Sequence, residues 1–365
     1  MAVDAENQPD RWQINESLNE LAQLAGTAGA VVVGQVSQKL PSPTKNYYIG
    51  LGKLEELVAF KQPGGYDVAI FDDELSALQQ RNLEQKLGVK IIDRSALILD
   101  IFARHARTKE GILQVELAQS EYLLPRLAGQ WRHLERLGGG IGTRGPGETQ
   151  IETDRRLVQR KITHLKKQIE NIRKHRRLYQ KRRQHSGIAL LALVGYTNTG
   201  KSSLLNCLSQ AEIPTADKLF ATLDPTTRRI SLPDGTPFLL SDTVGFIHKL
   251  PPGLVSAFRA TLEELSGANI LLHVVDIASP RAAEQCQTVE NILDDLEIGH
   301  KPRITVLNKI DKLLDESKEW NENEALAFLA ETAKSQDPAA VIISARRKWG
   351  IDNLKHAIAN LLPGS

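Results

Sequence analysis

An octapeptide of the form G-x-x-x-x-G-K-S constrains this sequence more than any other feature. It spans residues 195–202, follows the apolar run Ile188–Val194 and opens into Ser203–Asn206, which has helical character. A strand, a glycine-containing loop and a helix in this order form a phosphate loop, because backbone N–H groups at a helix N-terminus face the anion. The alternative is a glycine-containing turn that binds no nucleotide, and the flanking pattern argues against it. The sequence therefore predicts binding of a nucleoside triphosphate.

Two side chains of this loop have separate expected roles. Lys201 is expected to contact the β- and γ-phosphates, and Ser202 to supply one oxygen ligand to Mg²⁺. The predicted nucleotide contacts of the loop are Gly195, Tyr196, Thr197, Asn198, Thr199, Gly200, Lys201 and Ser202.

Length and composition indicate a soluble chain of several domains. The 365 residues predict two or three domains, and 41% of the residues are apolar. The sequence has neither an apolar run of about 18 residues nor a secretory leader, so we expect a cytoplasmic protein without stable membrane insertion. The two cysteines, Cys207 and Cys286, lack metal-site spacing and are expected to be reduced thiols.

Positive charge is concentrated in one segment. Residues 126–183 contain 17 Lys or Arg and 5 Asp or Glu, whereas the whole chain has a formal net charge of only +2. The remainder is therefore acidic, and the basic segment predicts a polyanionic partner.

The N-terminal part alternates strand and helix patterns. Residues 1–27 are expected to be loosely ordered, and residues 28–107 to form a small α/β domain. Its predicted strands are Ala30–Gly34, Tyr66–Phe71 and Val89–Ile92, and its predicted helices are Leu54–Phe60 and Ser76–Leu87. Gly50-Leu51-Gly52-Lys53 is a weak phosphate-binding signal, for which a plain turn is the favoured interpretation.

Two heptad-patterned segments follow, in residues 108–186. They predict an antiparallel coiled-coil hairpin, with Pro125 kinking the first arm or marking its real start. The seam residues are Leu113, Leu117, Ser120, Leu124, Leu127, Trp131 and Leu134 in the first arm and Val158, Ile162, Leu165, Ile169, Ile172, Arg176 and Tyr179 in the second.

The predicted hairpin has a basic second arm and a glycine-rich tip at residues 138–150. Such a tip allows close approach to folded RNA, although a solvated basic face with a passive connector would give a similar pattern. Few aromatic residues are available for stacking on single strands, so we favour recognition of RNA phosphates and shape.

Residues 187–365 again alternate strand and helix, which predicts a doubly wound, mostly parallel α/β domain with ligand loops at the strand C-terminal ends. The predicted strands are Ala189–Val194, Arg229–Leu232, Phe238–Ser241, Ile270–Asp276, Ile304–Leu307 and Val341–Ile343, and the final helix is Asp352–Leu362.

The loop Asp242-Thr243-Val244-Gly245 follows a predicted strand 40 residues after Ser202. Asp242 is expected to hold Mg²⁺ through water, and the Gly245 amide to contact the γ-phosphate. Between these elements, Thr222 is the predicted metal-ligating threonine of a nucleotide-sensing loop, with Thr226 as the rival. The nucleotide contacts predicted there are Phe220, Ala221, Thr222, Leu223 and Asp224.

A base-recognition loop follows the strand Ile304–Leu307. A carboxylate at Asp311 can accept hydrogen bonds from N1–H and N2–H₂ of guanine, a donor pair that adenine lacks. The residues predicted to bind the base are Asn308, Lys309, Ile310 and Asp311, together with Ser344, Ala345 and Arg346 after the last strand.

Four of these elements resemble those of translation-factor-type GTPases, namely G-x-x-x-x-G-K-S, D-T-V-G, N-K-I-D and S-A-R. The sequences F-A-T-L-D-P-T-T-R, G-G-G-I-G-T-R-G-P-G-E-T-Q-I-E-T-D-R-R and Y-I-G-L-G-K-L-E-E-L are similar to those of the HflX family of ribosome-associated GTPases, over nearly the whole chain from about Ala30. The resemblance implies GTP hydrolysis with Mg²⁺, a helical hairpin that engages the large ribosomal subunit and its RNA, and a role in splitting or rescuing ribosomes under stress. Some members carry a further C-terminal domain, which we expect to be absent here.

The predicted catalytic residues are Lys201, Thr222 and Gly245, and the predicted metal ligands are Ser202, Thr222 and Asp242. Phe246 occupies the position where many relatives place a water-orienting glutamine, which predicts slow intrinsic hydrolysis that the ribosome stimulates.

The leading interpretation is a monomeric, GTP-switched ribosome-binding enzyme. The alternatives are an NTP-driven RNA remodeller with a second nucleotide near Lys53, and a passive RNA chaperone that uses GTP only for stability.

Overall fold

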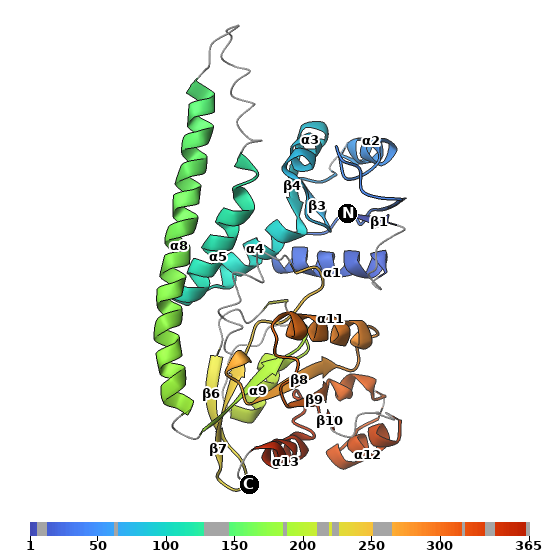
Figure 1. Ribbon diagram of the computed structural model, residues 1–365. Helices are drawn as coiled ribbons and strands as arrows, with labels where there is room; N and C mark the ends of the chain where they lie inside the picture. Colours follow the sequence, from blue (N-terminus) through green and yellow to red (C-terminus); the bar gives the residue numbers. More distant parts are fainter. Residues whose placement is uncertain are drawn as a thin grey trace. The chain divides into compact units, whose positions relative to one another are not determined.

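The computed structural model describes residues 1–5, 13–61, 65–127, 146–184, 188–209, 219–220, 226–250, 265–315, 318–332 and 340–362. The chain forms two compact units (Figure 1). The N-terminal unit comprises residues 1–172 together with 249–257, and the C-terminal unit comprises residues 173–248 and 258–365. The N-terminal unit is thus assembled from two separate stretches of chain.

The N-terminal unit begins with a small α/β arrangement. Strand β1 pairs in parallel with β2, and β3 pairs in parallel with β4. Helix α3 shows how local sequence sets these elements: Ser76 and Gln79 form a capping box at its start, and Gly88 adopts a left-handed conformation at its end. The elements are β1 (Ala2–Ala5), α1 (Ile14–Thr27), β2 (Ser37–Leu40), α2 (Leu51–Phe60), β3 (Val68–Phe71), α3 (Ala77–Leu87), β4 (Lys90–Asp93) and α4 (Arg94–His105).

Two expectations for this region are wrong. The described residues of this stretch, 1–5 and 13–27, are not loosely ordered, since they form β1 and the helix α1, which buries Leu18, Leu21 and Leu24 at helical spacing. The predicted strand at residues 30–34 is also absent, because β1 takes its parallel partner from Ser37–Leu40 instead. Val31 is left 88% exposed, so a β-branched run alone did not identify the strand.

The next helices in the chain are α5 (Lys109–Leu123) and the long α8 (Pro146–Gln184), of which residues 146–172 belong to the N-terminal unit and the rest to the C-terminal unit. Helix α5 ends immediately before Leu124 and Pro125, as expected from the missing proline N–H group. Lys161 and Lys166 of α8 form ion pairs with Glu116 and Glu121 of α5. Residues 128–145, which hold most of the predicted tip, lie outside the described residues, and the coiled-coil hairpin stays a prediction.

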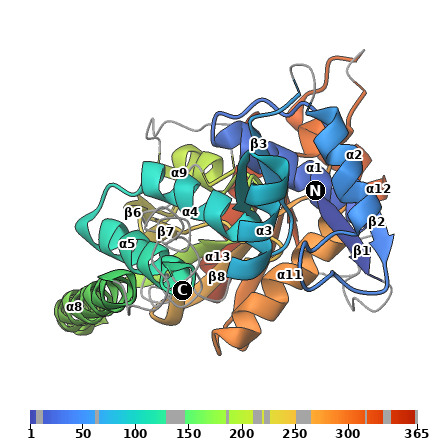
Figure 2. The ribbon, with the colours of Figure 1, turned by 90° about the horizontal axis from the view of Figure 1, so that it is seen from above.

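The C-terminal unit contains a six-stranded sheet in the order β10-β9-β8-β5-β7-β6. All neighbours are parallel except β6 and β7, which are antiparallel. Figures 1 and 2 show helices on both faces of this sheet, and the fold is the predicted α/β phosphate-loop fold. The elements are β5 (Ala189–Val194), α9 (Lys201–Ser209), β6 (Thr226–Ser231), β7 (Pro237–Asp242), β8 (Ile270–Asp276), α11 (Ala282–Asp295), β9 (Arg303–Asn308), the 3₁₀ helix η1 (Ile310–Leu313), α12 (Glu322–Thr332), β10 (Val341–Ile342) and α13 (Ile351–Leu361).

The sheet order fixes where a ligand loop can lie. The central strand β5 lies between β7 and β8, which both follow it in sequence and lie on opposite sides of it in the sheet. At such a strand, the loops that leave the carboxyl ends of neighbouring strands run to opposite sides of the sheet. Their divergence creates the usual ligand-binding crevice of such sheets. The loop 195–200 leaves the end of β5 and therefore lies at this position. No helix in the described part of the chain has the length and apolar character needed to cross a bilayer.

Candidate nucleotide-binding site

The phosphate loop joins β5 to α9, and Lys201 is the first residue of that helix. The Lys201 side chain folds back over the loop, where its Nζ donates to the carbonyl oxygens of Gly195 (3.1 Å) and Tyr196 (2.6 Å). Burial lowers the pKa of Lys201 to about 8; Asp242 opposes this shift and Lys309 adds to it. A cation in this position is suited to a phosphate group, because a nearby anion would restore the ammonium form.

The two metal-ligand candidates in the described residues converge. Ser202 Oγ donates a hydrogen bond of 2.6 Å to Asp242 Oδ2. A hydroxyl at the N-terminal end of α9 therefore faces a carboxylate at the C-terminal end of β7. A hard cation such as Mg²⁺ prefers oxygen donors of this kind and is usually completed by phosphate and water. This donor set therefore fits the predicted metal. The third candidate, Thr222, lies outside the described residues.

The D-T-V-G loop contacts the phosphate loop through its backbone. Thr243 Oγ1 donates to the Leu193 carbonyl (2.6 Å), which fixes the loop to β5. The Phe246 N–H donates to the Gly195 carbonyl (3.1 Å), and the Phe246 carbonyl accepts from the Thr197 N–H (2.7 Å). Residue 246 thus extends the sheet as an isolated parallel bridge, a contact that the sequence motifs did not indicate.

Asn308 braces the base loop against the phosphate loop. Its Nδ2 donates to the Thr199 carbonyl (2.8 Å), and its Oδ1 accepts from the Ala345 N–H (3.0 Å). The side chain is only 2% exposed. Gly200 has φ +95°, and a Cβ there would lie 2.3 Å from Asn308 Nδ2, so the glycine allows this close approach. The predicted bracing contact is therefore present.

The remaining base-loop residues are also held in place. Ser344 Oγ donates to Asp311 Oδ1 (2.6 Å), which fixes one oxygen of the carboxylate expected to recognise guanine. Lys309, with φ +67°, donates to the Asn198 carbonyl (2.5 Å) and forms an ion pair with Asp276 Oδ2 (2.8 Å). Asp276 was not among the predicted site residues, although its position at the end of β8 is a signal that could have indicated it.

The other predicted contacts are placed as follows. Ile310 is buried, Arg346 is exposed, and Val244 is buried beside Gly245. Phe220 is buried with φ +59°, and the rival Thr226 begins β6 opposite Asp242 of β7. Four predicted nucleotide contacts lie outside the described residues: Ala221, Thr222, Leu223 and Asp224.

Comparisons with known proteins identify the family. Residues 15–103 match the family described as GTP-binding GTPase N-terminal, residues 105–183 the GTP-binding GTPase Middle Region, and residues 190–309 the family described as 50S ribosome-binding GTPase. GTPase HflX of Caldanaerobacter subterraneus subsp. tengcongensis is 51% identical over 94% of this chain and 76% of its own length. The chain belongs to the HflX family of GTPases. It is accordingly an enzyme that hydrolyses GTP.

Two further comparisons agree with this assignment. GTPase HflX of Escherichia coli (strain K12) is 42% identical over 96% of this chain and 80% of its own length. The crystal structure of SsGBP in complex with GDP covers 99% of this chain and 97% of its own, with 26% identity and a TM-score of 0.50. The resemblance predicted from the motifs is therefore confirmed at the level of family and enzyme class.

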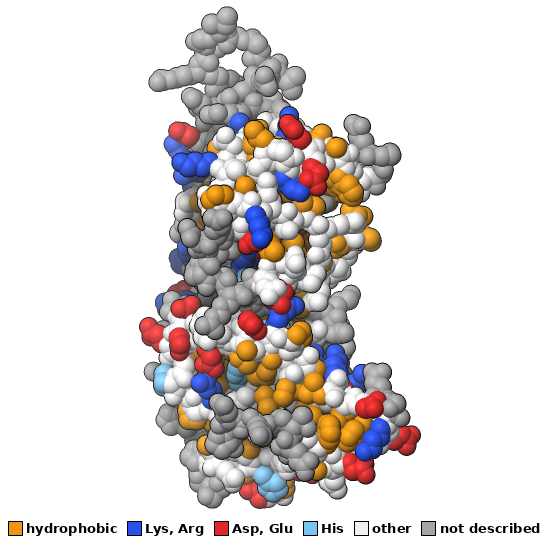
Figure 3. All heavy atoms as spheres, turned by 90° about the vertical axis from the view of Figure 1, so that its right-hand side faces the viewer, with side chains coloured by type: hydrophobic (Ala, Val, Ile, Leu, Met, Phe, Trp, Pro, Cys, Tyr) orange, Lys and Arg blue, Asp and Glu red, His pale blue; other side chains and the backbone are white. Residues whose placement is uncertain are grey.

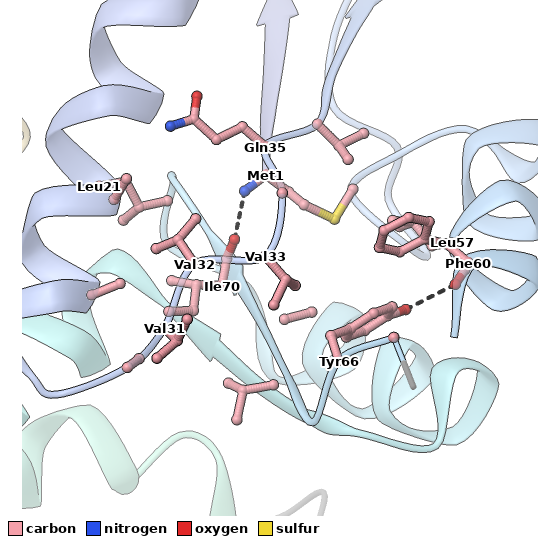
Figure 4. A pocket seen from close by; sticks show the side chains of 18 of the residues that line it. Met1, Leu21, Val31, Val32, Val33, Gln35, Leu57, Phe60, Tyr66 and Ile70 are labelled. Carbon is pink, nitrogen blue, oxygen red and sulfur yellow. Dashed lines mark hydrogen bonds between the residues drawn. The ribbon is translucent and has the colours of Figure 1, made fainter. Parts of the chain in front are cut away.

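The second phosphate-like motif of this HflX-family chain does not form a comparable site. Gly50 precedes the first turn of α2, and Lys53 Nζ is ion-paired with Glu56 at 2.6 Å. An adjacent cavity of about 910 Å³ is lined mainly by apolar residues such as Leu21, Val33 and Phe60 (Figure 4), and its lining residues also include Glu56 and Asp67. Among the described residues that line it there is no Lys or Arg, and burial lowers the pKa of the Met1 amine to about 6, so these residues do not suit a nucleotide phosphate.

The basic character of the second arm is visible in α8. Between residues 152 and 174, exposed positions include Arg155, Arg156, Arg160 and Lys167. On the face shown in Figure 3, by contrast, Lys and Arg side chains are interspersed with Asp and Glu among the described residues. The concentration of one sign of charge on α8 is the feature that suits a polyanion.

Proposed function

We propose that this HflX-family GTPase binds the large ribosomal subunit through ribosomal RNA, and that its bound guanine nucleotide controls this affinity. Its cellular role is then the splitting or rescue of ribosomes under stress, in the cytoplasm and as a monomer. The observation that carries the proposal is the pairing of a braced guanine-type loop in one unit with a basic helix in the same chain. The family description of residues 190–309 as a 50S ribosome-binding GTPase supports the same partner.

The site residues have the following proposed roles. Asp311 selects guanine, and Asn308 keeps the base loop beside the phosphate loop. Lys201 neutralises charge on the β- and γ-phosphates, and the Gly245 amide contacts the γ-phosphate. Ser202 and Thr222, with Asp242 acting through water, would hold Mg²⁺, which would neutralise phosphate charge when bound.

Phe246 determines the rate of GTP hydrolysis that we expect in the absence of ribosomes. Its side chain is 2% exposed and cannot hydrogen-bond to water, so it cannot orient an attacking nucleophile. We therefore infer that intrinsic hydrolysis is slow and that the ribosome accelerates it. Equal turnover with and without large subunits would contradict this inference.

We assign the RNA contact to exposed basic side chains of α8 that form no ion pair with the described residues. Lys161 and Lys166 already neutralise Glu116 and Glu121 at 2.7 and 2.8 Å, whereas Arg160 and Lys167 are exposed on the same helix. Arg160 and Lys167 are therefore the better candidates for RNA phosphates, and the paired lysines provide a control with the same loss of charge.

The experiment is co-sedimentation of the full chain with large subunits, in a non-hydrolysable GTP analogue and in GDP, over a range of salt concentrations. We expect tighter binding with the analogue. R160A/K167A should lower the slope of log affinity against log salt by about 2, and K161A/K166A should lower it less. Equal affinity in both nucleotides at matched ionic strength would refute nucleotide control. Equal slopes for the two double variants would refute the assignment to Arg160 and Lys167, and wild-type slopes in both would refute the assignment to α8.

A further inference from the structure

Asp276 is a carboxylate at the end of β8 that lies outside all of the nucleotide-binding motifs. Its Oδ2 pairs with Lys309 Nζ at 2.8 Å, and its Oδ1 accepts from the Ala278 N–H at 3.1 Å. All three residues belong to the C-terminal unit. One oxygen of the carboxylate therefore fixes the turn that follows β8, while the other faces the base loop.

Lys309 joins the base loop to the phosphate loop. Its Nζ also donates to the Asn198 carbonyl at 2.5 Å, so one ammonium group contacts both a carboxylate and the phosphate loop. The side chains of Lys309 and Asp276 are each 17% exposed, and salt screens such a pair less than an open surface pair. Among the described contacts, Asp276 provides the ion pair that holds Lys309 in this position.

The backbone is left-handed on both sides of the contact between the two loops. The φ angle is +67° at Lys309 and +59° at Asn198, which is uncommon for lysine and less so for asparagine. Such conformations persist where surrounding contacts impose them. The hydrogen bond from Lys309 to Asn198 joins the two positions directly, and the ion pair with Asp276 keeps the lysine aligned for it.

Lys309 also precedes the turn that carries the guanine-recognition carboxylate. It is the N-cap of η1, and Asp311 is the second residue of this 3₁₀ helix. Ile310 between them is fully buried, and the Lys309 carbonyl accepts from the Lys312 N–H at 3.0 Å. The position of Lys309 therefore affects where the base loop lies relative to the phosphate loop.

Asp276 also reduces the repulsion between two cations of the site. Burial lowers the pKa of Lys201 to about 8, and Lys309 adds to this shift while Asp242 opposes it. Because Asp276 balances its charge, Lys309 can lie near Lys201 before any phosphate is bound.

We propose that Asp276 is a positioning residue for guanine-nucleotide binding, because it holds Lys309 against the phosphate loop in the orientation that receives the base. With the ion pair intact, the Lys309 side chain is already ordered when the nucleotide enters. Without the ion pair, it must be ordered during binding, and the entropic cost lowers the affinity. The chemical step takes place at the γ-phosphate, to which Lys309 is not assigned, so kcat does not depend on Asp276. This inference rests on the proposed base site.

The test measures the affinity and release rate of radiolabelled GDP, and kcat and KM for GTP, with the full chain and without ribosomes. D276N removes the charge but keeps an oxygen that can accept from the Ala278 N–H, so the turn is preserved. We expect about tenfold weaker GDP binding, which corresponds to about 1.4 kcal/mol, with faster release and a higher KM. The kcat should stay within about twofold of wild type, because the groups at the γ-phosphate are unchanged.

Glu290→Gln is the matched control. It breaks an ion pair of the same unit, with Arg303 at the start of β9, which lies outside the nucleotide loops. E290Q should therefore retain wild-type GDP affinity.

A double-mutant cycle tests whether the effect passes through Lys309. K309A removes the ammonium group, so D276N has no ion pair to break in this background. We expect D276N to weaken GDP binding about tenfold on its own and by less than about twofold when it is added to K309A. A merely structural role of Asp276 in the turn would instead give the same loss in both backgrounds, and thermal unfolding would change with it.

Three results would overturn the proposal: wild-type GDP affinity in D276N, the same loss in both backgrounds, or a loss of kcat with unchanged GDP affinity. D311N separates this from a failure of the base site. If D311N binds GDP like wild type, the proposed base site is wrong. If D311N loses GDP binding while D276N is normal, only the positioning role is wrong.

Discussion

Asn308 provides the most quantitative prediction, because its amide makes two hydrogen bonds to buried backbone groups. Replacing it with alanine leaves the Thr199 carbonyl and the Ala345 N–H without these partners. Each unsatisfied buried group costs about 1–3 kcal/mol, so N308A should destabilise the C-terminal unit by about 4 kcal/mol. For a unit of this size, that corresponds to a decrease in Tm of roughly 8–16 °C.

Asn308→Asp refines the same prediction. An aspartate still accepts from the Ala345 N–H, but its second oxygen faces the Thr199 carbonyl, and two acceptors repel. Protonation would convert that oxygen into a donor, so the folded state raises the pKa of the new carboxyl above its unfolded value. The stability of N308D relative to wild type should therefore improve as pH falls through the folded pKa.

The assay is thermal unfolding of nucleotide-free protein, followed by titration with GDP. Asn291→Ala is the matched control, because this exposed asparagine of α11 bonds only to Gln287 among the described contacts. Gly200→Ala should reproduce the defect, since its new Cβ would lie 2.3 Å from Asn308 Nδ2. If N308A unfolds within 2 °C of wild type and retains its GDP affinity, the bracing role is refuted.

Three further predictions concern single side chains. Asp311→Asn should weaken GTP binding by roughly 100-fold or more. It should favour xanthosine triphosphate, because the 2-oxo group of xanthine can accept a hydrogen bond from the new amide. An unchanged nucleotide preference in a competition assay would refute the base contact. Phe246→Leu keeps an apolar side chain of similar size, so intrinsic turnover should stay within about threefold, and abolished turnover in a stably folded variant would show that the ring itself acts in hydrolysis. The pKa of Asp72 is lowered to about 2, because Arg94 and Lys249 outweigh the effect of burial. The contribution of ionised Asp72 to the free energy of unfolding is therefore present above the unfolded pKa near 4 and is lost as pH falls toward 2. Denaturant titrations should show a loss of about 1 kcal/mol by pH 3, and a smaller loss in D72N.

The sequence allowed the C-terminal fold and much of the site to be predicted, because each motif sits at the end of an apolar strand. The structure has the predicted six strands with small shifts at their ends, and Asn308, Ser344 and Ser202 make contacts between loops that were predicted separately. Strand ends converge in a doubly wound sheet, so local patterns there carry three-dimensional information.

The N-terminal unit was harder to predict for a physical reason. Its β1 and β2 are short and pair across the intervening helix α1, so hydrophobic runs such as Val31–Val33 did not mark the strand. The ion pair between Asp72 and Lys249 joins residues that are 177 positions apart, and no local pattern encodes such a contact. Backbone bridges such as that of Phe246 are likewise independent of side-chain type.

The discontinuity of the N-terminal unit has a consequence for synthesis of the chain. Its second stretch begins at Lys249, after the whole of residues 173–248 has been translated. At about 5–20 residues per second, the delay is roughly 4 to 15 s. During that interval the nascent α/β core carries Asp72 beside Arg94 without its second cation. This unit therefore cannot reach its final state one domain at a time, and its completion waits until the phosphate loop and the D-T-V-G loop have also emerged from the exit tunnel.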